Sequence, residues 1–210
     1  MKLRVEHITS YQYDAPVKYA LQQLKLTPKD RPGQQHIVDW AIDIEGGSQQ
    51  LHYSDHHGNG VDLIAIDGGV SELTIRCHGT VELETWDGVI GAHRGAMPLW
   101  TFLRPTPLTR AGRQVRALTA QLGRDYANDI ERAHALSALI IDRLAYRIGV
   151  TDAETTAEQA LGSDGGVCQD HAHVFIGAAR ALGIPARYVS GYLMMDDRIE
   201  QDAGHAWAEA

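Results

Sequence analysis

The sequence is poor in the features that mark exported and membrane proteins. Its 210 residues include two cysteines, and no apolar run approaches the ~20 residues that a helix needs to cross a bilayer. The start of the chain, from Met1 to His7, alternates apolar and polar residues and so lacks the continuous apolar stretch of a signal peptide. We therefore expect a cytoplasmic protein, or one that has lost an upstream segment, with no membrane partner. In such a protein Cys77 and Cys168 are expected to be free thiols.

Positive charge is also scarce. Nineteen Lys and Arg residues stand against 27 Asp and Glu residues, which gives a formal net charge of -8. Affinity for nucleic acid comes mainly from basic side chains that neutralise phosphates, so we expect no nucleic-acid partner. The 44% hydrophobic and 22% charged residues are ordinary for a globular chain, and this length allows a core divided between two lobes.

The first half of the chain has the pattern of β structure. Apolar residues alternate with mostly polar ones from Val38 to Ile44, which predicts a strand with Val38 and Trp40 on its buried face. Similar alternation begins at Leu3 and returns over residues 73–83, and glycine-containing turns separate the runs. We predict an antiparallel β-sandwich-like domain over residues 1–105.

The second half has helical periodicity. A proline-rich stretch over residues 97–108 forms the predicted connection between the halves. Apolar spacing then predicts helices over 115–122 and 130–144, the second of them capped by Asn128 with Glu131. Thr155 with Glu158 predicts a further cap, before a short helix that ends near residue 162. The whole chain is predicted to be α+β, with a second domain over residues 106–210.

A fourth predicted helix brings a cysteine to its first turn. Ala172 begins an apolar stripe that runs to Leu182, and Gly183 is placed to end the helix. Cys168 lies four residues before Ala172, where the helix dipole and unpaired N–H groups stabilise a thiolate and can bind an oxyanion. Gly165 and Gly166 are expected to leave room for a substrate carbonyl. A buried, inert thiol is the alternative for this residue.

The C-terminal segment supplies a histidine. Over residues 204–210 His205, Trp207 and Glu209 share one face of a predicted strand, and alanines fill the other. Two stretches now resemble the core signature of bacterial transglutaminase-like proteins: residues 166–193, GVCQDHAHVFIGAARALGIPARYVSGYL, and residues 204–209, GHAWAE. Residues 93–95 and 102–109 are similar to the amino-terminal domain that is commonly fused to this core.

The resemblance implies a papain-like α+β core and a Cys-His-Asp triad. It assigns Cys168 as the nucleophile and His205 as its acid/base partner, with the Asp expected on a strand beyond Ala210, so that the core is truncated here. Glu209 is roughly 13 Å from His205 along a strand, too far to replace the Asp. Asp170 and Asp202 are not obvious substitutes. Without an orienting carboxylate, we expect this chain to be weakly active or inactive.

The expected reaction is acyl transfer through a thioester at Cys168, with a protein or peptide substrate that presents a Gln carboxamide or a peptide bond. The resemblance does not choose between an amine and water as the acceptor, so the enzyme could be an acyltransferase, an amidase or a protease. A non-catalytic protein-binding module on the same scaffold is the alternative function.

Two metal sites are weaker alternatives. Cys168 with three histidines (His171, His173 and His205) offers zinc ligands, but within one helix His173 projects about 140° away from Cys168. The acidic residues Asp196, Asp197, Glu200 and Asp202 offer calcium ligands, without the spacing of an EF-hand. We therefore expect no metal and no cofactor.

Overall fold

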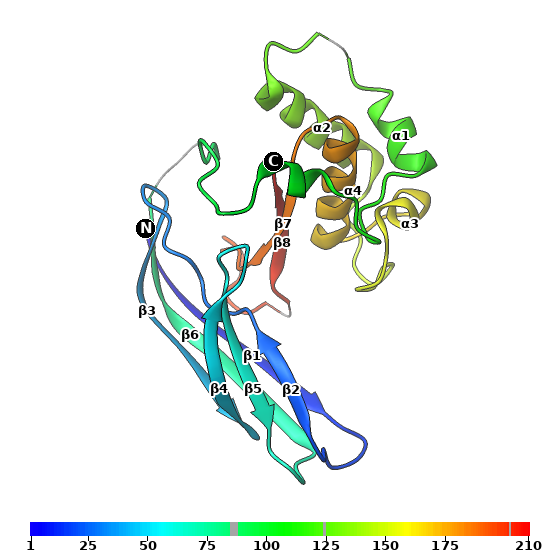
Figure 1. Ribbon diagram of the computed structural model, residues 1–210. Coiled ribbons are helices and arrows are strands. Elements are labelled where there is room, and N and C mark those ends of the chain that lie inside the picture. The colour runs from blue at the N-terminus through cyan, green and yellow to red at the C-terminus, as the bar shows by residue number, and fades with distance from the viewer. Residues whose placement is uncertain (85–87, 124, 202) are drawn as a thin grey trace. The chain divides into compact units, whose positions relative to one another are not determined.

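A computed structural model describes residues 1–84, 88–123, 125–201 and 203–210. The chain divides into two compact units, Met1–Met97 and Pro98–Ala210 (Figure 1). Within the described residues, no helix is long and apolar enough to cross a membrane.

The first unit consists of two antiparallel three-stranded sheets. One has the order β1 (Lys2–Gln12), β6 (Glu72–Leu83), β3 (Gln35–Glu45), and the other has the order β2 (Ala20–Leu24), β5 (Gly60–Ile66), β4 (Gly47–Ser54). Side chains from both sheets form one core, as alternating strands with one apolar face require. This arrangement confirms the predicted antiparallel, sandwich-like domain. The buried members of the core are Leu24, Ile64, Ile66, Leu73 and Ile75.

A β-bulge in β3 corrects the predicted facing of Val38. The pairing of β3 with β6 shifts register between Ile37 and Asp39, so the alternation changes phase at this point. Val38 is 44% exposed, whereas Trp40 is half-buried as predicted. The sequence pattern alone did not reveal the extra residue, because Val38 has the same two-residue spacing as the apolar residues that follow it, Trp40 and Ile42.

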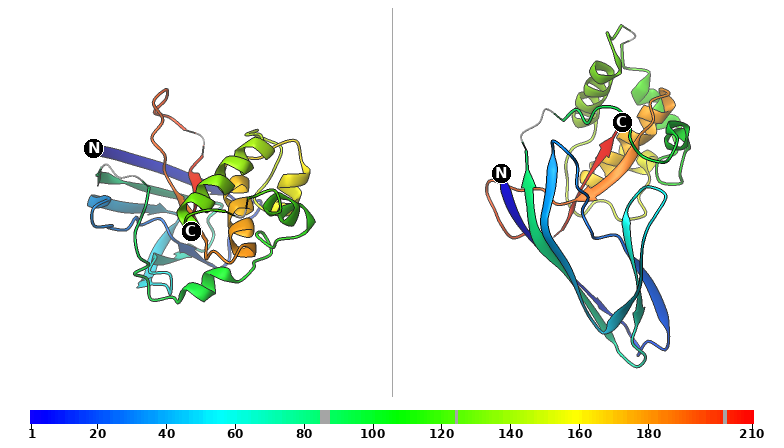
Figure 2. Two further views of the ribbon diagram at one scale, coloured as in Figure 1. Left: turned by 90° about the horizontal axis from the view of Figure 1, so that it is seen from above. Right: turned by 60° about the vertical axis from the view of Figure 1, so that its left-hand side comes forward.

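The second unit is built around one helix. It contains the short 3-10 helix η1 (Leu99–Leu103), the helices α1 (Arg113–Thr119), α2 (Asp129–Arg143), α3 (Ala157–Gly162) and α4 (Cys168–Ala181), and the hairpin of β7 (Arg187–Gly191) and β8 (His205–Glu209). α4 lies between the hairpin on one side and α1 and α3 on the other (Figure 1, Figure 2). Most of its residues are buried, in a core shared with α1, α2 and α3.

The segment around η1 packs with the second unit. Phe102 is buried, and its carbonyl oxygen accepts hydrogen bonds from Arg180 Nε (2.7 Å) and from the N–H of Ala186 (3.2 Å). The division between the units accordingly falls at residues 97 and 98, whereas the proline pattern suggested 105 and 106.

Helix caps follow local sequence in one case and tertiary packing in another. Asn128 caps α2 by accepting from the N–H of Glu131, as predicted. The cap of α3 lies one residue later than predicted, because Thr156 with Gln159 forms its capping box. Glu158 is thereby released to accept hydrogen bonds from the first turn of α1.

Candidate active site

Cys168 is the first residue of α4 and is half-buried. Val167 precedes it in an extended conformation, so the chain turns into the helix at the thiol. The first N–H groups of a helix have no partner within the helix, and the aligned peptide dipoles add partial positive charge there. The structure thus places the thiol at a helix start, as the sequence predicted. Cys77, by contrast, is fully buried in β6.

A buried carboxylate anchors the turn that carries the thiol. Asp170 Oδ2 accepts hydrogen bonds from the N–H of Val167 (2.7 Å) and from Oγ1 of Thr151 (2.6 Å). The first bond is one half of a capping box, and the second ties the loop before α3 to the start of α4. Oδ1 of Asp170 is buried and has no hydrogen-bond partner in the described part of the chain. The structure therefore assigns Asp170 a supporting role that the sequence analysis missed, although its place in the first helical turn was a signal for it.

The two glycines before Cys168 allow close packing of the backbone around them. A Cβ atom at Gly165 would lie 2.6 Å from the carbonyl oxygen of Ala145, and one at Gly166 would lie 2.7 Å from the side chain of Asp170. Backbone hydrogen bonds also tie Gly166 to Ala145 and Arg147. Protein atoms therefore fill the space on the Cβ side of both glycines, so the room for a substrate carbonyl that the sequence suggested does not lie on that side.

The β7–β8 hairpin brings His205 to the same end of α4 as Cys168. β7 starts near the C-terminal end of α4, where Arg180 Nη2 donates to the carbonyl oxygen of Ala186 (2.8 Å). It runs back along the helix, since the ring of Tyr188 lies 5.3 Å from that of His173. β8 is antiparallel to β7 and begins with His205 opposite Gly191, the last residue of β7. His205 therefore enters the sheet beside the N-terminal end of α4.

The side chain of His205 shares a sheet face with Trp207. Ala206 is buried and Ala208 packs on the helical core, so the alanine face is directed at α4. His205 and Trp207 lie on the opposite face, with ring centroids 6.4 Å apart. No hydrogen bond joins His205 to Cys168 within the described residues. The fold brings the two predicted site residues to one end of the helix but does not pair them.

The sequence matches two family models. Residues 3–82 match the bacterial transglutaminase-like N-terminal region, and residues 116–210 match the transglutaminase-like superfamily. The chain belongs to the transglutaminase-like superfamily. An uncharacterized protein of Mycobacterium leprae is 26% identical over all of this chain and 79% of its own length. An uncharacterized protein of Mycobacterium tuberculosis is 28% identical, over 99% of this chain and 72% of its own.

A crystal structure of a proposed cysteine protease from Cytophaga hutchinsonii has the same fold. It aligns with a TM-score of 0.76 and 22% sequence identity, over all of this transglutaminase-like chain and 72% of the other. The match confirms the predicted fold, in which antiparallel sheets precede a transglutaminase-like core. At this identity it is evidence for the fold alone.

The nearby carboxylates of this transglutaminase-like protein are engaged elsewhere. Glu209 accepts from Nε of Arg187 at 2.7 Å across the β7–β8 pair. Asp170 is held by Val167 and Thr151, and Asp202 lies outside the described residues. The Asp expected beyond Ala210 thus stays a prediction.

The histidine after the Cys-Gln-Asp run is bound to backbone carbonyls. Nδ1 of His171 lies 2.9 Å from the oxygen of Val167, and Nε2 lies 2.9 Å from the oxygen of Leu144. Both ring nitrogens therefore face backbone carbonyl oxygens. Over the described part of the chain, no three His, Cys, Asp or Glu residues are placed to hold a metal ion.

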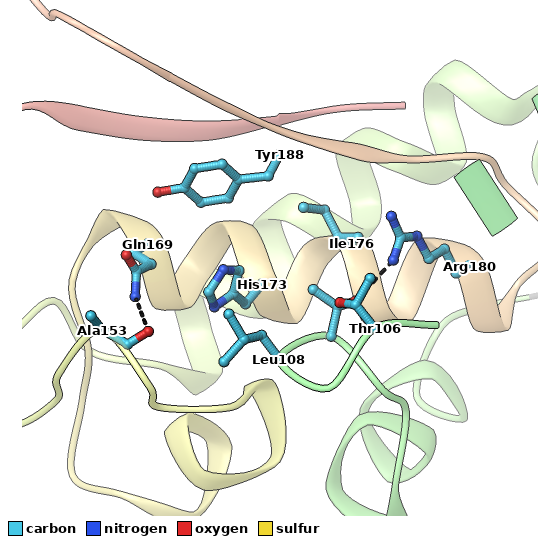
Figure 3. Close-up of a pocket in the computed structure, with 9 residues that line it drawn as sticks. Thr106, Leu108, Ala153, Gln169, His173, Ile176, Arg180 and Tyr188 are labelled. Carbon is cyan, nitrogen blue, oxygen red and sulfur yellow. Dashed lines mark hydrogen bonds between the residues drawn. The ribbon is translucent and has the colours of Figure 1, made fainter. Parts of the chain in front are cut away.

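A cavity of about 360 Å³ runs along α4. Gln169, the residue after Cys168, lines it together with His173, Tyr188 and the apolar side chains of Leu108 and Ile176 (Figure 3). Burial lowers the pKa of His173. The Thr155 backbone and the Asp170 carboxylate act to raise this pKa, but the effect of burial is larger. Burial raises the pKa of Tyr188, and negative charge on Cys168 and Asp170 raises it further. At neutral pH these side chains are a neutral imidazole and a protonated phenol.

Proposed function

We propose that this protein is a cysteine enzyme that cleaves or exchanges amide or peptide bonds through a thioester on Cys168, with His205 as the acid/base partner. The observation that supports this most directly is the topology. α4 begins with Cys168, and β8 begins with His205 at the same end of that helix.

The reaction follows from these two groups. His205 takes the proton of the Cys168 thiol, and the thiolate attacks the carbonyl carbon of a Gln carboxamide or a peptide bond. The C–N bond then breaks, and the imidazolium gives its proton to the departing nitrogen. An amine or water attacks the thioester, and the thiol is restored. Catalytic hydrogen bonds often form only in the complex with substrate, and this mechanism requires the bond between His205 and Cys168 to form at that stage.

A non-catalytic protein-binding module is the second candidate. The lack of a hydrogen bond between Cys168 and His205 in the described residues favours it, because a scaffold can persist without its chemistry. The free His205 face, with Trp207 beside it and 40% exposed, would then serve contact with a partner.

The two candidates differ in the reactivity of Cys168. We would measure its alkylation by iodoacetamide against pH in wild type, in His205→Ala, and in His134→Ala as a matched control, since His134 is an exposed residue of α2. Peptide mass spectrometry separates Cys168 from the buried Cys77, and alkylation of both in urea gives the reference rate.

An ion-paired nucleophile reacts well below the ordinary thiol pKa of ~8.5 and loses this reactivity in His205→Ala but not in His134→Ala. Incubation with a glutamine-containing peptide, with and without a primary amine, then identifies the acceptor. If Cys168 has an ordinary thiol profile that ignores His205, the enzyme proposal is wrong and the binding module takes its place.

A further inference from the structure

The phenol of Tyr188 lies along the first turns of α4. Its ring packs against His173, and its hydroxyl points over Gln169 toward the end of the helix where Cys168 lies (Figure 3). The pairing of Tyr188 with Ala208 fixes this direction, because it puts Tyr188 on the sheet face that is directed at α4.

Tyr188 is 40% exposed, so its hydroxyl is accessible to a ligand. Among the described residues it makes no hydrogen bond, either to Cys168 or to another group. Burial and the negative charge on Cys168 and Asp170 raise the pKa of Tyr188, so the hydroxyl keeps its proton at neutral pH. A thioester reaction needs such donors, because attack on a carbonyl puts negative charge on its oxygen.

The cavity beside this hydroxyl has space for the acyl group. Its wall continues from Gln169 and Tyr188 along α4 to the apolar side chains of Leu108 and Ile176. Gln169 lies in the first turn of α4, where the N–H groups have no partner within the helix.

We propose that Tyr188 donates a hydrogen bond to the oxyanion that forms when Cys168 attacks, as a second donor beside the N–H groups at the start of α4. This inference rests on the proposed function. It makes Tyr188 a catalytic residue that acts on the carbonyl oxygen and leaves the reactivity of the thiol unchanged.

Two reactions of the same thiol separate these effects. p-Nitrophenyl acetate acylates Cys168 through a tetrahedral oxyanion: the thiolate adds to the carbonyl carbon, and p-nitrophenolate leaves with the electrons of the broken C–O bond. Iodoacetamide alkylates the same thiolate by direct displacement of iodide and forms no oxyanion. A donor to the oxyanion speeds the first reaction alone.

The experiment compares both rates between pH 6 and 8 in wild type, Tyr188→Phe and Tyr126→Phe. Tyr126, in the loop before α2, is the matched control. Cys168→Ala gives the background. We expect Tyr188→Phe to slow acylation about 100-fold, as when one oxyanion donor is lost, with alkylation unchanged and Tyr126→Phe like wild type.

Each other result overturns the inference in a recognisable way. Equal acylation by Tyr188→Phe and wild type means that the phenol does not contact the oxyanion. A parallel change in both rates means that Tyr188 acts on the thiolate or on the local fold. If wild-type Cys168 is alkylated with a shifted pH profile but is not acylated, the proposed function itself fails, and the role of Tyr188 fails with it.

Discussion

The carboxylate of Glu158 holds two helices together, and its removal should weaken the second unit measurably. Although it belongs to α3, Glu158 accepts hydrogen bonds from the N–H groups of Gly112 (2.9 Å), Gln114 (2.9 Å) and Val115 (2.8 Å) at the start of α1. Gly112, the residue before α1, has no side chain that could cap the helix. Glu158, which lies more than forty residues later in the chain, therefore caps the start of α1 in place of a local side chain.

The size of the effect follows from these bonds. A hydrogen bond to a charged acceptor contributes about 1.5–3 kcal/mol, and partial exposure of this carboxylate screens part of it. In Glu158→Gln one amide oxygen remains as acceptor while the NH₂ group faces N–H donors. We expect a loss of about 2 kcal/mol, or about 4–8 °C in Tm for a chain of this size.

The pH dependence has a definite sign. Burial acts to raise the pKa of Glu158, but the backbone N–H groups of Val115, Gln114 and Gly112 together outweigh it, so the pKa is lowered from its ordinary 4.5. A lowered pKa in the folded state gives stability that is fully present above the unfolded pKa and is lost as pH falls through the folded one. The difference between wild type and Glu158→Gln should therefore shrink below about pH 4.5.

The assay combines urea unfolding, followed by circular dichroism, with amide hydrogen exchange of residues 112–119. Glu154→Gln is the matched control, because Glu154 is exposed in the loop before α3. Faster exchange at the start of α1 in Glu158→Gln alone supports the argument. If Glu158→Gln and Glu154→Gln behave alike in both measurements, α1 does not depend on this carboxylate and the reasoning is refuted.

Two further substitutions test the packing around α4. Gly177→Ala should cost about 1–3 kcal/mol in urea unfolding, because its Cβ would lie 2.7 Å from the carbonyl oxygen of Thr109, whereas Gly162→Ala should cost little. Asp170→Ala should cost about 2 kcal/mol or more and increase proteolytic cleavage near residues 151–167, since the N–H of Val167 and the hydroxyl of Thr151 lose their acceptor. Asp164→Ala, on an exposed loop residue, is its control, and equal stability of the two would contradict the anchoring role.

Local signals in the sequence were sufficient for the elements that position the site. The apolar stripe from Ala172, together with Gly183, which has a φ of 83°, marks the bounds of α4 and so puts Cys168 at its start. The alternation around His205 places that residue on a strand. Both patterns depend on the periods of helix and strand, which a chain reveals without knowledge of its partners.

Tertiary structure decided what those patterns do not encode. The bulge that exposes Val38 depends on the pairing of β3 with β6. The close packing at Gly165 depends on the carbonyl oxygen of Ala145, twenty residues earlier in the chain. The same holds for the use of Glu158 on α1, since its own helix is capped by Thr156. The ring of Tyr188 lies against that of His173 because β7 folds back along α4, a contact between residues fifteen positions apart that has no periodic signature.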